Sequence, residues 1–210
     1  MDAKTAVKMP SKPHALFMAI RPRTLSIPSI QVISGTVLAY AVQGKIDWLL
    51  ALSAWLVSVF ITIAVNLLND VVDFQKGGDP LERNGFLKVI RAGYLSEKEV
   101  LAASFVSLAL VFLFGLPLII KGGEWMLAVI IISAIMAYAY TGGPFPISYL
   151  GLSELFVFLF YGIVCIGSSF YVQTGNLNPA VFLLITQMGM LAVVPNALNN
   201  FRDIDEDVQY

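Results

Sequence analysis

The chain has 210 residues, of which 58% are hydrophobic and only 13% are charged. Soluble domains carry about 25% charged residues, so the composition indicates a protein surrounded by lipid, with a length that suits one helical bundle. A net charge of −1 argues against a nucleic-acid partner, which would require a basic face. Cys165 is the single cysteine, so no intrachain disulfide can form, and we expect it to be a small buried hydrophobic residue.

The first 24 residues are basic and are interpreted as a flexible cytoplasmic segment (1–24) that precedes the membrane domain (25–210). They lack the compact apolar region and the small-residue cleavage site of a secretory signal. We therefore expect the first transmembrane helix to direct insertion. His14 lies in this flexible segment, and no catalytic role is expected for it.

Six segments are apolar and long enough to cross the core of a bilayer, which takes about 20 helical residues. They are Leu25–Val42, Trp48–Leu68, Val100–Ile120, Trp125–Tyr140, Leu155–Val172 and Pro179–Leu198. The last two belong to one charge-free run that is too long for a single helix, and the polar stretch 173–179 divides it. The sequence therefore predicts an all-α, polytopic transmembrane bundle of six helices.

The distribution of Lys and Arg among the connections predicts the orientation of this bundle. With the N-terminus inside, the cytoplasmic side carries Lys4, Lys8, Lys12, Arg21, Arg23, Lys76, Arg83, Lys88, Arg91, Lys98 and Arg202. Only Lys45 and Lys121 remain outside. We therefore predict a multi-pass protein of the cell (inner) membrane with a cytoplasmic N-terminus. The loops 70–98 and 141–153 and the C-terminal tail then share the cytoplasmic side.

Four polar side chains lie along the end of the second predicted helix, namely Asn66, Asn69, Asp70 and Asp73, and Asp79 follows in the loop. The spacing of the first four, i, i+3, i+4 and i+7, places them on one helical stripe. Carboxylates on one stripe repel each other unless a cation lies between them, and Mg²⁺ binds through one or two carboxylates plus substrate phosphates. A solvated helix end is the alternative, but the asparagines extend the stripe into the membrane and favour a metal site.

The end of the sixth predicted helix repeats this pattern 130 residues later. There the corresponding positions are occupied by Asn196, Asn199, Asn200 and Asp203, and Asp207 follows one turn later. Four helices separate the two copies, so both emerge on the cytoplasmic face. We interpret the pattern as an internal duplication with one metal-binding stripe per copy, although a chance similarity of short segments is the alternative. Two facing stripes could bridge a pair of Mg²⁺ ions and clamp one diphosphate.

The loop after the first stripe supplies cations: Lys76, Arg83, Lys88 and Arg91 stand among several glycines. Guanidinium groups suit bidentate contacts with phosphate. Basic cytoplasmic loops also arise simply because they set the topology, so the sequence leaves both roles open. Ser96 and Glu99 predict a capping box at the start of the third helix.

The loop after the fourth predicted helix is uncharged and rich in glycine, proline and aromatic residues over 138–151. Its rings could line a cavity and face an apolar or cationic intermediate. They could equally form an aromatic belt at the membrane interface. The sequence leaves this choice open.

Together these stretches resemble the UbiA family of intramembrane prenyltransferases, over nearly the whole chain from Arg21 to Asp207. The resemblance is carried by Arg21-Pro-Arg-Thr-Leu, Asn69-Asp70-x-x-Asp73-x5-Asp79, Tyr140-Thr-Gly-Gly-Pro-Phe-Pro with Tyr149-Leu-Gly-Leu-Ser-Glu-Leu, and Asn199-Asn-x-Arg-Asp203-Ile-x-x-Asp207. The uncharged loop is closer to the branch that acts on 1,4-dihydroxy-2-naphthoate. Hydroxybenzoate-type members tend to carry a basic residue there.

The resemblance implies transfer of a polyprenyl group from polyprenyl diphosphate to an aromatic acceptor, here 1,4-dihydroxy-2-naphthoate. Diphosphate and CO₂ would be lost, and a demethylmenaquinone would form. Carried onto this sequence, the Mg²⁺ ligands are Asp70, Asp73, Asp79, Asp203 and Asp207, and the catalytic residues are Asn66, Asp70 and Asp73. The diphosphate would contact Arg83, Lys88, Arg91, Asn69 and Asn199. The family fold has nine transmembrane helices around a lipid-facing cavity, so this chain with six is expected to be incomplete at its C-terminus.

Three alternatives remain open at the level of sequence. The acceptor could be another aromatic acid such as 4-hydroxybenzoate, or the chain could be an inactive remnant of the family. In a different class of protein, intramembrane acids and asparagines mark the ion path of a cation transporter. Transporters usually place such groups near the midplane of the membrane, whereas both stripes here lie at helix ends.

Overall fold

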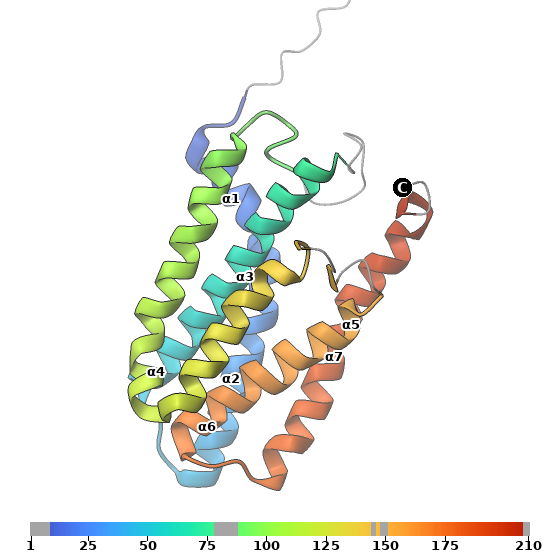
Figure 1. The fold of residues 1–210 in the computed structure, drawn as a ribbon. Coiled ribbons are helices and arrows are strands. Elements are labelled where there is room, and N and C mark those ends of the chain that lie inside the picture. The colour runs from blue at the N-terminus through green and yellow to red at the C-terminus, as the bar shows by residue number, and fades with distance from the viewer. Residues whose placement is uncertain (1–8, 78–87, 144–145, 148–150, 208–210) are drawn as a thin grey trace, which may run out of the picture.

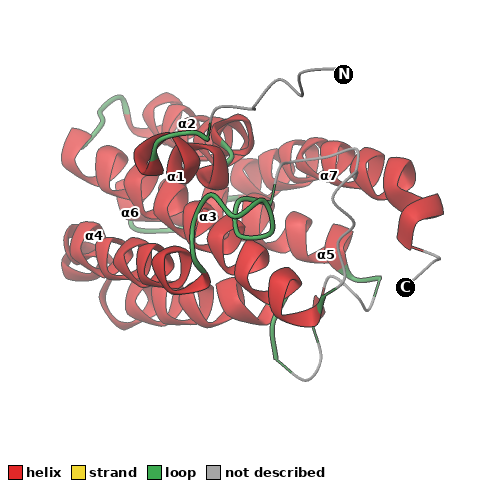
Figure 2. Cartoon of the chain, turned by 90° about the horizontal axis from the view of Figure 1, so that it is seen from above, coloured by secondary structure: helices red, strands yellow, loops and turns green. Residues whose placement is uncertain are grey.

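The computed structural model of the chain describes residues 9–77, 88–143, 146–147 and 151–207, without the side chains of 202–207. In these ranges the regular structure is entirely helical, which confirms the predicted all-α class (Figure 2). The elements are α1 (Lys12–Ile20), a 3₁₀ turn (Pro22–Leu25), α2 (Ser26–Gln43), α3 (Trp48–Lys76), α4 (Glu97–Ala139), α5 (Ser153–Val157), a π-helical segment (Phe158–Gly167), α6 (Ser168–Thr174) and α7 (Pro179–Asp207).

Helix α4 contains two of the predicted spans, because the chain reverses at Gly123. This glycine has φ 65° and ψ −149°, a backbone conformation that other residues rarely adopt. The two arms return side by side (Figure 1), and Gly115 on the first arm lies against Ile130 on the second. Five helical elements are long and apolar enough to cross a membrane. Because α4 contributes two arms, the six predicted spans are confirmed.

Two helices are longer than predicted at the ends that carry the acid motifs. Helix α3 continues past Leu68 to Lys76 and stops at Gly77, which has φ 70°. Helix α7 continues to Asp207. Asp70 and Asp73 are therefore helical, which confirms their predicted place at the end of the second helix, and the loop predicted over 70–98 begins only after Lys76.

The N-terminal segment is also more ordered than predicted, because Lys12–Ile20 form helix α1. Nine residues make a marginal helix in isolation. Here Ala15 and Ala19 are buried in a cluster that includes Ile63 and Leu67 of α3, so packing stabilises the helix. The prediction of a flexible segment is thus wrong for this part, and His14 lies on the exposed side of α1.

The C-terminal ends of α3 and α7 lie at the same end of the bundle as α1 (Figure 1). The connections 44–47 and 175–178 and the reversal at Gly123 lie at the opposite end. This arrangement confirms the prediction that the two acid motifs emerge on one side.

The outer surface of the bundle is apolar. Ile120, Trp125 and Leu198 are 84%, 77% and 64% exposed. Large apolar side chains in such numbers on the outside indicate lipid contact rather than contact with water. The surface and the apolar helices together identify a multi-pass membrane protein.

Close approach of helices depends on glycine at one contact that shapes the site. Gly162 of the π-helical segment faces Gly189 of α7, and a Cβ on Gly162 would lie 3.2 Å from the Cα of Gly189. Small residues at such a contact let two membrane helices pack backbone to backbone. This contact fixes α7 beside the π-helical segment and so positions the asparagines at its end.

Candidate functional site

A cavity of about 1180 Å³ lies between α2, α3, the two arms of α4, the span from α5 to α6, and α7. One end is polar and lies where α3 and α7 end; it is lined by Asn66, Asn69, Asp73, Lys76, Lys88, Asn196, Asn199 and Asn200. The other end is apolar and approaches the reversal of α4; it is lined by Ala54, Val57, Leu118, Met126 and Ile130. This shape suits an amphiphile with a charged head and a long apolar tail.

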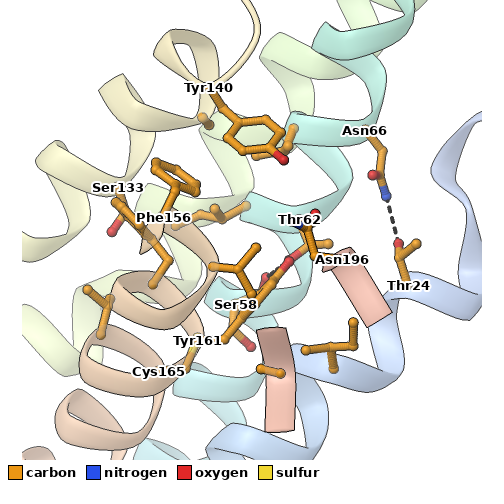
Figure 3. Close-up of a pocket in the computed structure, with 18 of the residues that line it drawn as sticks. Thr24, Ser58, Thr62, Asn66, Ser133, Tyr140, Phe156, Tyr161, Cys165 and Asn196 are labelled. Atoms are coloured by element: carbon orange, nitrogen blue, oxygen red, sulfur yellow. Dashed lines mark hydrogen bonds between the residues drawn. The ribbon is translucent and has the colours of Figure 1, made fainter. Parts of the chain in front are cut away.

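Three of the four residues of the first stripe line this cavity. The Asn66 side-chain nitrogen donates to the backbone oxygen of Ile20 at 2.8 Å and to the hydroxyl of Thr24 at 2.9 Å. Figure 3 shows the Asn66 nitrogen turned toward Thr24. The Asn69 side-chain oxygen accepts a hydrogen bond from the Thr141 hydroxyl. The structure therefore fixes the direction of both amides.

Asp70 differs from its neighbours on the stripe, because it does not line the large cavity. It is 3% exposed, and its Oδ2 accepts a hydrogen bond from the backbone N–H of Val89 at 3.1 Å. Its Oδ1 is buried and has no hydrogen-bond partner within the described part of the chain. The residue thus faces the turn over 88–95 rather than the cavity.

The basic residues after α3 occupy different places. The Lys88 ammonium forms an ion pair with the Asp73 carboxylate, and both residues line the cavity. The Arg91 guanidinium lies 3.5 Å from the Gly77 carbonyl and lines a small adjoining pocket. Arg83 and Asp79 lie outside the described residues. Of the predicted phosphate contacts in this loop, the structure places Lys88 at the cavity.

Lys76 ties α3 to the neutral loop. Its ammonium donates to the Thr141 carbonyl at 3.1 Å. The same threonine donates its hydroxyl to Asn69. Thr141 lies within the stretch Tyr140-Thr-Gly-Gly-Pro-Phe-Pro but was not predicted as a site residue, and it holds two polar residues at the rim of the cavity.

The second stripe also reaches the cavity. Asn196, Asn199 and Asn200 of α7 line its polar end. Asp203 and Asp207 lie on the helical backbone of α7, and their side chains lie outside the part that the structure describes. The two matched asparagine pairs therefore meet at one cavity, as the predicted duplication requires.

Sequence reasoning missed Ser153 and Glu154 as site residues. The Asn200 side-chain nitrogen donates to Glu154 Oε1 at 2.6 Å and to Ser153 Oγ at 2.9 Å. The Asn196 nitrogen approaches the same two oxygens at 3.5 and 3.2 Å. The one signal in the sequence was an acidic residue at the start of a long charge-free run, within a stretch that carries the family resemblance.

Aromatic rings form one wall of the cavity (Figure 3). The rings of Tyr140 and Phe156 have centroids 4.8 Å apart, and those of Phe156 and Phe160 are 4.3 Å apart. Tyr161 lines the same cavity. For Tyr140, this placement favours the cavity-lining alternative over an interfacial belt. Phe145 and Tyr149 lie outside the described residues.

The π-helical segment and its flanks contribute a regular series to the lining. Their lining residues come in adjacent pairs that recur every four positions: Phe156 and Val157, Phe160 and Tyr161, Val164 and Cys165, Ser168 and Ser169. Cys165 was predicted to be a small buried residue, and it is partly buried beside the cavity.

The residues at the polar end fit a hard divalent cation. No group of three His, Cys, Asp or Glu side chains comes together among the described residues. Mg²⁺ does not need such a cage, because it binds through one or two carboxylates and completes its shell with waters and substrate phosphates. The Asp73 carboxylate and the amide oxygens of Asn66 and Asn196 supply the required type of ligand.

Comparisons with known proteins find similarity to one protein family. The model of the UbiA prenyltransferase family matches residues 30–210. The 1,4-dihydroxy-2-naphthoate octaprenyltransferase of Bacillus subtilis is 32% identical over 206 residues, which cover 98% of this chain and 66% of that protein. The Escherichia coli protein of the same name is 34% identical over 203 residues, covering 94% and 66%. A 2-carboxy-1,4-naphthoquinone phytyltransferase of Synechocystis is 25% identical over 196 residues, covering 90% and 61%. The chain thus spans slightly less than two thirds of the length of these relatives.

Proposed function

Because the chain belongs to the UbiA prenyltransferase family, we propose that it transfers a polyprenyl group from polyprenyl diphosphate to 1,4-dihydroxy-2-naphthoate. Diphosphate and CO₂ leave, and the product is a demethylmenaquinone. The names of the two relatives at 32% and 34% identity support this acceptor. The uncharged loop after α4 also supports it, because a basic residue there is typical of hydroxybenzoate-type members.

The observation that carries the proposal is the polarity of the cavity. A polyprenyl diphosphate has a charged head and an apolar tail, and the cavity has a polar end with Asp73 and Lys88 and an apolar end with Leu118 and Met126. The tail would extend toward the reversal of α4. The head would remain where α3 and α7 end.

At the polar end, Lys88 and the side-chain nitrogen of Asn69 would donate to the diphosphate. The oxygen of Asn69 already accepts from Thr141, which leaves its nitrogen as the donor. We include Asn199, Arg83 and Arg91 in this proposal as further phosphate contacts. Lys88 would then exchange its ion pair with Asp73 for a contact with the diphosphate.

We propose Mg²⁺ as the cation that accompanies the diphosphate, with Asp73 as a ligand and Asp79, Asp203 and Asp207 as further ligands. Asn66 and Asp70 complete the proposed set of ligands. Because Asp70 faces the turn over 88–95, its unpartnered Oδ1 would have to turn toward the cavity to bind the cation. When bound, the cation neutralises the diphosphate and makes it a better leaving group. The ends of α3 and α7 would hold these ligands close to one another.

The aromatic wall would stabilise the prenyl cation that remains when the diphosphate departs. Cleavage of the bond between the prenyl carbon and oxygen gives an allylic cation, which the faces of aromatic rings stabilise. Tyr140, Phe156 and Tyr161 line the cavity and are proposed for this role. The carboxylate-bearing carbon of the electron-rich acceptor ring then attacks the allylic cation.

The test uses the full chain in lipid nanodiscs with Mg²⁺, labelled polyprenyl diphosphate and naphthoate labelled in its carboxyl group. We expect prenylated product and labelled CO₂ in equal amounts. Asp73→Asn should lower kcat/KM by about 10²-fold or more, the scale for loss of one electrostatic group at the reacting centre. Glu124→Gln, at the far end of the bundle, should leave it unchanged.

Two outcomes would contradict the proposal in different ways. Product formation with 4-hydroxybenzoate and none with the naphthoate would show that the acceptor is wrong. Cation flux in proteoliposomes without consumption of prenyl diphosphate would favour a transporter and overturn the enzymatic assignment.

A further inference from the structure

The amide group of an asparagine can serve a cation only if its oxygen faces the site. Its oxygen accepts hydrogen bonds and binds cations, whereas its nitrogen only donates. At the polar end of the cavity, the side-chain nitrogens of Asn66, Asn196 and Asn200 each donate to an acceptor, and their oxygens have no partner within the described residues. These amides keep this orientation only if their neighbours prevent a rotation that exchanges oxygen and nitrogen.

In the second copy of the motif, Glu154 prevents this rotation. A carboxylate has no proton to donate, so it accepts from every neighbour. The Ser153 hydroxyl therefore directs its proton to Glu154 Oε2, at 3.0 Å. With its proton committed, the same hydroxyl oxygen can only accept, and it receives the nitrogens of Asn196 and Asn200 at 3.2 and 2.9 Å.

We propose that Glu154, acting partly through Ser153, is a positioning residue that holds the oxygens of Asn196 and Asn200 toward the cation and diphosphate. This inference rests on the proposed function. Both oxygens of Glu154 take part in this positioning, because Oε1 accepts from Asn200 and Oε2 accepts from Ser153. Glu154 thereby makes two amide oxygens available as ligands for the cation, at a site with few carboxylates.

The first copy of the duplicated motif follows the same logic with different groups. The Asn66 nitrogen donates to the Thr24 hydroxyl at 2.9 Å. That hydroxyl donates its own proton to the Arg21 carbonyl at 2.9 Å, so it too can only accept from the asparagine. A backbone carbonyl thus has the role in the first copy that the Glu154 carboxylate has in the second.

The left-handed backbone of Arg21 supports this correspondence. Its φ of 55° is the only positive φ of a non-glycine residue within the described ranges, and its ψ is 67°. Such strain persists only where the surroundings enforce it, and it is concentrated at functional sites. Here the conformation places the Arg21 carbonyl as the acceptor for Thr24, and through Thr24 it orients Asn66.

Because the second copy uses a side chain, its orienting group can be changed. In Glu154→Gln, the new amide can donate as well as accept, so Ser153 and both asparagines lose their fixed direction. We expect the dissociation constant for a divalent cation to rise about tenfold, the lower end of the range for loss of a ligand-orienting partner. The unfolding midpoint should change little, since size and packing are retained.

The measurement is a titration of Mn²⁺, followed by its electron paramagnetic resonance signal, on the full chain in nanodiscs with inorganic pyrophosphate. Glu124→Gln serves as the matched control and should bind as the wild type does. A second variant combines Glu154→Gln with Asn200→Asp. Its carboxylate offers oxygen to the cation in either orientation, so most of the affinity should return.

The outcomes separate this inference from the function on which it rests. No Mn²⁺ binding by the wild type would overturn the proposed function and the inference together. Wild-type binding with an unchanged dissociation constant in Glu154→Gln would overturn the inference alone. Weak binding by both the single and the double variant would indicate lost packing rather than lost orientation, and would overturn it as well.

Discussion

Asp70 and Asp73 are one helical turn apart, yet they have different neighbours. Asp73 lines the cavity and pairs with Lys88, whereas Asp70 is buried against the turn that follows. That turn places Val89 at 0% exposure and Ile90 at 6% in the same apolar cluster as α1. The Asp70 carboxylate therefore holds the segment that presents Lys88 to the cavity.

This arrangement predicts a local effect of Asp70→Leu. The substitution leaves the buried N–H of Val89 without an acceptor, which costs about 1–3 kcal/mol. Amide hydrogen exchange over 88–95 should become faster, as measured by mass spectrometry in nanodiscs. Asp70→Asn keeps an acceptor oxygen and is the matched control. Equal protection in the wild type and Asp70→Leu would show that the turn does not depend on this carboxylate.

The sequence predicted part of the site because helical spacing is a local property. It identified Asn66, Asn69 and Asp73 as one stripe, and all three line the cavity. It could not show that Asp70 faces away from the cavity, because the partner of Asp70 is Val89, which lies 19 residues later in the sequence. Glu154 was missed for the same reason, since its partner Asn200 is 46 residues away.

At the scale of elements, α4 shows how one residue divides an apolar run. Its two arms are joined at Gly123, where no neighbouring atom lies within 4 Å of the position that a Cβ would take. Crowding therefore does not explain the glycine. The backbone does, since φ 65° with ψ −149° is nearly exclusive to glycine.

Gly123→Ala should consequently destabilise the hairpin of α4 without changing any contact of the cavity. A residue held in such a region costs about 1–3 kcal/mol. The unfolding midpoint in mixed micelles should fall, whereas the neighbouring exposed substitution Glu124→Ala should stay within about 0.5 kcal/mol of the wild type. Equal midpoints for the two variants would argue against a left-handed turn at this position.

The predicted elements agree with the structure where apolar pattern alone decides them. Both arms of α4 were predicted, because Lys121 and Glu124 interrupt the apolar run around two glycines. Helix α1 was not predicted, because its stability comes from packing against α3 rather than from its own nine residues.

For the whole molecule, the distribution of Lys and Arg predicts that the polar end of the cavity faces the cytoplasm. Single-cysteine variants in a Cys165→Ala background test this orientation. Asn176→Cys, in the exposed connection 175–178, should react with a membrane-impermeant maleimide in intact cells. Lys98→Cys, at the start of α4, should react only after the membrane is permeabilised. The reverse pattern would invert the orientation.

Along the wall formed by the π-helical segment, the residues that line the cavity recur every four positions. An α-helix turns about 100° per residue, so positions four apart drift by about 40°, and three such steps would rotate the last pair by about 120° away from the first. The wider π turns rotate less per residue and offset this drift. The alignment of Phe156 with Ser168 therefore depends on how many residues separate them more than on which apolar residues they are. Exchanges of side chain leave the alignment in place, whereas the loss of a single residue would turn every later pair out of register with the cavity.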